Sequence, residues 1–90
     1  MAAQKTYCID SEKLAWRVID GEVVILNLDS GYYYRLDPVG TQIWQMLEKK
    51  KRQGEIIKNL AKQYSQPESR IQKDFDSLVK DFKKEGLIKN

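Results

Sequence analysis

Aromatic side chains are concentrated in one short stretch of the chain. Three consecutive tyrosines, Tyr32, Tyr33 and Tyr34, are followed directly by Arg35. Tyrosine provides a large ring and a polar hydroxyl at a low entropic cost of immobilisation, which suits a surface that binds another chain. The chemistry that this stretch offers is recognition rather than the making or breaking of bonds.

Residues that usually perform catalysis are scarce. The chain has no His and a single cysteine, Cys8, so a Ser or Cys nucleophile would lack its usual general base. No paired carboxylates and no glycine-rich phosphate loop can be assembled, and a zinc site would need carboxylates alone. We therefore expect no enzyme activity, no metal and no cofactor. Cys8 cannot form an internal disulfide, and we expect a free thiol in an N-terminal tail over residues 1–13.

Length and charge further limit the classes of protein to which the chain can belong. Ninety residues make one domain, and the net charge is +3. Residues 1–47 carry four cations and six anions, whereas residues 48–90 carry twelve and seven, so a polyanion would prefer the second half. No apolar stretch approaches the roughly 20 residues of a membrane helix, and the N-terminus lacks the apolar core of a signal peptide. We expect a cytoplasmic protein with no membrane partner.

The first part of the chain has the pattern of strands. Alternation over residues 14–19 and a continuous apolar run within 22–28 predict two strands, joined at Asp20-Gly21 by a turn that allows positive φ. A second turn ending at Gly31 leads to a third strand over 31–36. The unbroken apolar run favours 22–28 as the central strand, with the other two as edges.

A helical period begins at Asp37-Pro38, an N-cap followed by proline at the first helical position. Helices are predicted over 38–50 and 55–64. A third helix is predicted to begin at the capping box Ser65-Gln66-Pro67-Glu68 and to end at Gly86, because glycine is the usual residue just after a helix C-terminus. The first helix has an apolar stripe at Val39, Ile43, Met46 and Leu47, with Trp44 beside it. The predicted fold is α+β: a three-stranded antiparallel meander followed by three helices, in one domain over residues 14–90.

The third strand should leave an exposed edge, at which an extended peptide can add as a further strand. A period of two places Tyr32, Tyr34 and Leu36 on one face and Tyr33 and Arg35 on the other. In the purely structural interpretation, which the pattern favours for Tyr32 and Tyr34, these two are core residues with solvated hydroxyls and Tyr33 is a cross-strand aromatic. The last helix would form the second wall, with one flank made of Arg70, Asp74, Ser77 and Asp81. Its lysines Lys73, Lys80 and Lys84 are interpreted as solubility residues.

The order and spacing of these motifs resemble a known family. Over about residues 14–89 the chain resembles the PqqD-like family, the RiPP recognition elements. The matching positions are Gly21, Val24 to Leu28, Gly31 to Tyr34, Leu36-Asp37, Gly40, Ile43-Trp44, Asp74-Phe75, Leu78, Phe82 and Gly86-Leu87-Ile88. The resemblance implies a winged-helix-like, non-catalytic adaptor that binds the leader region of a ribosomally made precursor peptide. It also implies delivery of that peptide to a tailoring enzyme, such as a radical-SAM protein, a leader protease or a cyclase.

The resemblance places the peptide on the third strand, against the last helix, and carries Tyr32 to Leu36 and Asp74 over as contacts. Arg70, Ser77 and Asp81 follow from helical position alone. The candidate peptide-binding residues are Gly31, Tyr32, Tyr33, Tyr34, Arg35, Leu36, Arg70, Asp74, Ser77 and Asp81.

Two alternatives stay open. The last two helices resemble a helix-turn-helix in the basic half of the chain, which is typical of a winged-helix nucleic-acid-binding protein, although aspartates at 74, 76 and 81 suit base recognition poorly. An exposed edge also permits a homodimer by strand pairing.

Overall fold

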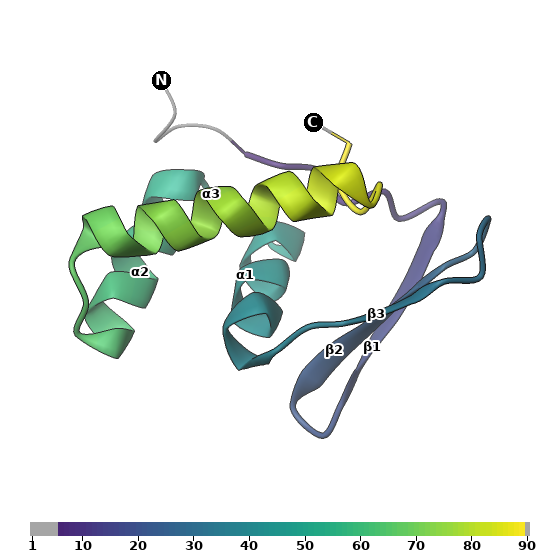
Figure 1. Cartoon of the computed structure of the whole chain (residues 1–90), viewed down its shortest axis with the longest axis horizontal. Helices are drawn as coiled ribbons and strands as arrows, with labels where there is room; N and C mark the ends of the chain where they lie inside the picture. Colours follow the sequence, from purple (N-terminus) through teal and green to yellow (C-terminus); the bar gives the residue numbers. More distant parts are fainter. Residues whose placement is uncertain (1–5, 90) are drawn as a thin grey trace.

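The computed structural model describes residues 6–89 and contains a three-stranded sheet and three helices (Figure 1). Helix α3 extends along the molecule from α2 to the sheet, and α1 lies between them (Figure 1). The predicted α+β fold, a meander followed by three helices, is confirmed. The elements are β1 (Leu14–Ile19), β2 (Glu22–Asn27), β3 (Tyr33–Arg35), α1 (Pro38–Glu48), α2 (Gln53–Tyr64) and α3 (Glu68–Lys84).

Strand β2 is central and pairs antiparallel with β1 and with β3, as predicted. The turn between β1 and β2 has positive φ at Asp20 and Gly21, 52° and 79°, which matches the twist of the hairpin. Trp16 is opposite Ile25, and Ile25 is opposite Tyr34. One face of the sheet therefore carries Leu14, Trp16, Val23, Ile25, Tyr34 and Leu36 toward the helices.

The second turn is longer than predicted, and both strands beside it are shorter. The Asn27 side-chain oxygen accepts hydrogen bonds from the backbone N–H groups of Asp29 and Ser30, at 2.9 and 3.1 Å, which ends β2 at Asn27. Gly31 then has a φ of 79°, and β3 begins only at Tyr33. Tyr32 precedes the strand and is 68% exposed, so the interpretation of Tyr32 as a core residue is wrong.

Helix α1 begins as predicted. The Asp37 carboxylate accepts a 2.7 Å hydrogen bond from the Gly40 N–H, with Pro38 at the first helical position. The helix ends at Glu48 rather than residue 50, because Lys50 adopts a left-handed φ of 63°. The predicted stripe is displaced: Val39 is 37% exposed and Trp44 is fully buried, so Trp44 lies at the centre of the buried face.

The predicted capping box at Ser65 to Glu68 is wrong. Ser65 has a φ of 52° and ends α2, and the N-cap of α3 is Pro67, with no side-chain hydrogen bond to the helix. Gly86 ends α3 as predicted, with a φ of 73°. The Leu87 N–H then donates a 2.8 Å hydrogen bond to the Phe82 carbonyl, and the Gly86 N–H donates one of 3.1 Å to the Lys83 carbonyl. This pair of bonds is a Schellman motif. Helix α2 begins at Gln53, two residues earlier than predicted.

Trp44 of α1 joins the sheet to α3 in the core. Its ring meets Trp16 of β1 edge-to-face at a centroid distance of 5.4 Å and Phe82 of α3 at 5.6 Å. Phe75, Ile56, Leu60 and Leu87 are also almost completely buried around it. The apolar faces of all three helices therefore share one core with the inner face of the sheet.

Part of the expected N-terminal tail packs against the folded chain. Tyr7 is 6% exposed and its hydroxyl donates a 3.0 Å hydrogen bond to the Gln53 side-chain oxygen. Ile9 pairs antiparallel with Ile88, and the Lys89 N–H bonds the Cys8 carbonyl at 2.8 Å. A tail over 1–13 therefore does not describe residues 7–10, since their burial depends on contacts with α2 and the C-terminal segment. Residues 1–5 of that range lie outside the described residues.

Candidate functional site

Within residues 6–89, strand β3 pairs with β2 alone, so its other edge is free of any described strand. The Tyr32 carbonyl accepts a hydrogen bond from the Asn27 N–H, and the Leu36 N–H donates one to the Val23 carbonyl, each at 2.9 Å. Because these bonds alternate along an antiparallel strand, Tyr34 also directs its backbone groups toward β2. Tyr33 and Arg35 therefore direct their backbone N–H and C=O groups away from the sheet, where an extended chain can pair with them.

A groove lies between this edge and the C-terminal half of α3. Its volume is about 400 Å³. Its floor is apolar and includes Leu36, Leu78, Phe82 and Leu87, and its rim is polar. The β3–α3 groove, as we call it, is lined by residues 33–36 together with Leu78, Asp81, Phe82, Glu85 and Leu87.

The wall contributed by α3 is a single stripe of the helix. At about 100° per residue, Asp74, Leu78, Asp81 and Glu85 lie within an arc of about 60°. Glu85 is fixed by Tyr34, whose hydroxyl donates a 3.1 Å hydrogen bond to it across the groove. Partial burial raises the pKa of Tyr34, and the hydrogen bond to Glu85 and the charge of that carboxylate raise it further. Tyr34 therefore stays a neutral donor at ordinary pH.

A second hollow continues from the groove beyond Leu78, which lines both. This Asp74 hollow has a volume of about 270 Å³ and is lined by Asp37, Val39, Gly40, Ile43, Asp74 and Leu78. It lies where the first turn of α1 faces the middle of α3. The exposed Val39 lines this hollow, together with the carboxylates of Asp37 and Asp74.

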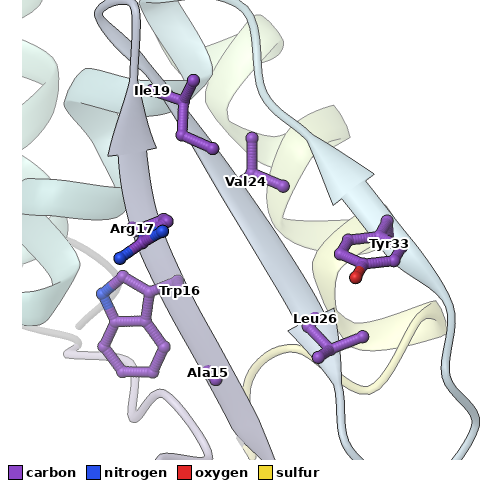
Figure 2. A pocket seen from close by; sticks show the side chains of 7 residues that line it. All are labelled: Ala15, Trp16, Arg17, Ile19, Val24, Leu26 and Tyr33. Carbon is purple, nitrogen blue, oxygen red and sulfur yellow. The ribbon is translucent and has the colours of Figure 1, made fainter.

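The other face of the sheet, which we call the outer face, is covered by none of the three described helices (Figures 1 and 2). It holds a shallow hollow of about 340 Å³, in which Val24, Leu26 and Tyr33 lie beside one another across β2 and β3 (Figure 2). Arg35 is anchored at its border by a 2.7 Å ion pair with Glu22. Arg17 lies on β1 at the same hollow, and no carboxylate among residues 6–89 comes within 4 Å of it.

The structure brings together five of the ten candidate residues: Tyr33, Tyr34, Arg35, Leu36 and Asp81 line the β3–α3 groove. Asp74 lines the adjoining hollow. Gly31 and Tyr32 precede β3, and Arg70 and Ser77 are exposed on α3 and line neither hollow.

Sequence reasoning overlooked Glu85 and Leu87 and treated Leu78 and Phe82 only as core. One signal in the sequence could have identified the wall that α3 contributes to the groove. Leu78, Asp81 and Glu85 follow Asp74 by four, seven and eleven residues, which places all four on one side of a helix.

Within residues 6–89, no three His, Cys, Asp or Glu side chains are grouped so as to hold a metal ion. Over the same residues, no helix has the length and apolar character needed to cross a membrane.

Comparison with protein families gives a match to coenzyme PQQ synthesis protein D (PqqD) over residues 22–88. The chain belongs to the PqqD family. The match begins at β2 and ends after α3, so it includes both walls of the groove. The expectation from the sequence motifs is confirmed. No curated protein matches the chain significantly.

A solved structure resembles this PqqD-family chain closely. It is "TbiB1 in Complex with the TbiA(beta) Leader Peptide", with a TM-score of 0.87 and 31% sequence identity, covering 92% of this chain and 95% of that one. TbiB1 is thus a protein of the same fold and nearly the same extent whose structure includes a leader peptide. Neither comparison supports the nucleic-acid alternative.

Proposed function

We propose that this protein is a non-catalytic adaptor that binds the leader region of a ribosomally synthesised precursor peptide. The observation that carries the proposal is the free edge of β3 beside an apolar groove, in a PqqD-family chain that resembles a leader-peptide complex. The leader adds to β3 as a fourth strand, since backbone hydrogen bonds give affinity there and the groove selects side chains.

The geometry of β3 defines the main-chain contacts in this proposal. The backbone groups of Tyr33 and Arg35 pair with the leader, because those of Tyr34 and Leu36 are engaged with β2. The leader's side chains on the inner side then meet Leu36, Leu78 and Asp81. Gly31, Tyr32, Arg70 and Ser77 contribute only if the peptide extends past the ends of the groove.

Titration of labelled leader peptides tests this function. The probes are fluorescein-labelled leader segments from the short precursor reading frames beside the gene, read by fluorescence anisotropy. Saturable binding is expected. The absence of binding by every neighbouring leader at high micromolar concentration would refute the proposal.

The Tyr33→Pro variant tests the mode of binding. Proline removes the outward N–H at this position and leaves the hydrogen bonds between β2 and β3 in place, so leader affinity should fall while circular dichroism stays that of the wild type. Tyr33→Ala is the matched control, since it removes the ring and keeps the N–H. Unchanged affinity in Tyr33→Pro would exclude strand addition at β3.

We further propose that the adaptor presents the leader to a separate tailoring enzyme, such as a radical-SAM protein, a leader protease or a cyclase. The outer face suits this contact because it stays open when the groove is filled and continues into the groove through Tyr33, which lines both hollows. Arg17, which has no carboxylate of residues 6–89 within 4 Å, lines the same hollow as Val24 and Leu26 and fits an apolar side chain next to a carboxylate on the enzyme.

Substitution on the outer face separates this contact from leader binding. Arg17→Glu together with Leu26→Thr should abolish co-elution with the enzyme encoded beside the gene, while leader affinity stays within about two-fold of the wild type. Retained co-elution would place the enzyme contact elsewhere.

A further inference from the structure

The two hollows along α3 are acidic, although the chain as a whole carries a charge of +3. Their linings include four carboxylates, those of Asp37, Asp74, Asp81 and Glu85, and one guanidinium, that of Arg35. Arg35 does not offset them, because its guanidinium lies 2.7 Å from the Glu22 carboxylate, with which it is paired. A peptide in the groove therefore meets uncompensated negative charge.

Asp74 and Asp81 have no cation within 4 Å among residues 6–89, although α3 carries lysines at 73, 80, 83 and 84. At about 100° per residue, those lysines lie about 60° or more outside the arc of the stripe, and none of them lines either hollow. Glu85 is oriented by the Tyr34 hydroxyl, which leaves its other carboxylate oxygen available. The helix thus contributes three carboxylates to the linings of the two hollows and none of its cations.

Leu78 lies between these carboxylates and lines both hollows. Asp74 and Glu85 are separated by eleven residues, about 16 Å along the helix axis, which corresponds to about five residues of an extended peptide. In such a peptide every second side chain points the same way. One apolar side chain over Leu78 and Phe82 would then have a neighbour two residues away on either side, near Asp74 and near Asp81.

We infer that this protein selects a cationic leader segment, in which an apolar side chain is flanked by Lys or Arg two residues before and two residues after it. This inference rests on the proposed function and specifies the peptide class that the groove accepts. The cations pair with Asp74 and with Asp81 and Glu85, at the partly exposed rim, while the apolar side chain fills the floor. The same arrangement disfavours acidic leaders, since a carboxylate beside Asp81 would be repelled.

Two labelled peptides of about twelve residues test the inference, with Lys-Thr-Leu-Thr-Lys or Glu-Thr-Leu-Thr-Glu at the centre of the same neutral flanks. The wild type should bind the cationic peptide at least about ten-fold more tightly at low salt, and about 0.5 M NaCl should reduce the difference. Asp74→Asn and Asp81→Asn should each weaken binding of the cationic peptide by about two- to five-fold. Asp76→Asn is the matched control, because it makes the same charge change on the opposite side of α3 and should leave affinity unchanged.

The outcomes separate the selectivity from the function. Equal affinity for the two peptides, or an equal loss in Asp76→Asn, overturns the charge selectivity and leaves the leader-binding function standing. If neither peptide binds and the neighbouring leaders do not bind either, both proposals fail. If the neighbouring leaders bind and are acidic in the segment protected by strand pairing to β3, the selectivity alone is wrong.

Discussion

The hydroxyl of Tyr34 donates a 3.1 Å hydrogen bond to the carboxylate of Glu85, 51 residues further along the chain. Tyr34 belongs to the edge strand β3, and Glu85 caps the C-terminus of α3. The bond therefore spans the two walls of the groove at one end and fixes their separation there. It also places a carboxylate where a helix C-terminus, which carries negative partial charge, would not by itself attract one.

This bond should contribute measurably to stability. Tyr34→Phe is expected to lower the free energy of unfolding slightly, since the bond is solvent-exposed but involves a charged acceptor. Urea denaturation of Tyr34→Phe, Glu85→Ala and the double variant gives the coupling energy. Glu85→Gln, which keeps an acceptor oxygen, should lose less than Glu85→Ala. A coupling energy of zero would mean that the bond does not join the walls in solution.

Tyrosine ionisation provides a second test. Burial raises the pKa of Tyr34 above its ordinary value of 10.0, and the hydrogen bond to Glu85 adds to this; burial and the charge of Asp76 raise the pKa of Tyr7. Because the folded state holds these protons more tightly than the unfolded state, the associated stability is present below about pH 10 and is lost as the pH rises through the raised values. Ultraviolet titration of tyrosinate absorbance should show a fraction of the tyrosines that ionise only at the highest pH, and Tyr34→Phe should reduce this fraction. If Tyr34→Phe instead removed absorbance that appears near pH 10, the raised pKa of Tyr34 would be contradicted.

Thr41 joins the meander to the first helix. Its buried hydroxyl accepts a 2.9 Å hydrogen bond from the Val23 N–H and donates one of 3.3 Å to the Leu36 carbonyl. Thr41→Val should lower the free energy of unfolding by about 1–3 kcal/mol, because the Val23 N–H is left buried without an acceptor. Thr41→Ser keeps the hydroxyl and should cost less than about 1 kcal/mol. Equal losses in the two variants, by urea denaturation, would assign the effect to the methyl group instead.

The helix ends offer a stabilising substitution. Ser65 closes α2 with a φ of 52°, a conformation that costs a residue with a Cβ about 1 kcal/mol relative to glycine. Ser65→Gly should therefore raise the melting temperature by several degrees, in a domain of this size. Gly86→Ala is the reciprocal change: an added Cβ would meet no heavy atom within 4 Å, so its expected loss of about 1 kcal/mol reflects φ alone. A lower melting temperature in Ser65→Gly would contradict this account.

The meander was predictable because its signals are local. Asp20-Gly21 permits the two positive φ values of a tight turn, and Asp37-Pro38 caps and starts a helix wherever the rest of the chain lies. The pattern at Ser65 to Glu68 was ambiguous, since the same residues can end one helix or begin the next. Here Ser65 took the left-handed conformation that closes α2, and its side chain does not cap α3.

The candidate site was predictable on the strand and less so on the helix. Tyr33 and Arg35 were assigned to one face by the period of two, and β3 has a free edge as expected. Which flank of α3 faces that edge depends on how the helix crosses the sheet, a tertiary property that a helical wheel does not contain. How far the groove extends along the helix is likewise a tertiary property: Arg70 and Ser77 line neither hollow, while Glu85 lines the groove.

The bridge between Ile9 and Ile88 has a mechanical consequence. Because the two segments run antiparallel, the chain leaves the bridge on the same side in both directions, at Cys8 and at Lys89 (Figure 1). A force that draws the two ends apart would load these hydrogen bonds one after another, as in unzipping, rather than all at once. Tyr7 precedes the bridge in the chain, so its contact with Gln53 would be loaded first from the N-terminal side, and the segment after α3 would loosen before the sheet bore any tension. Pulling from the ends would thus open the groove first.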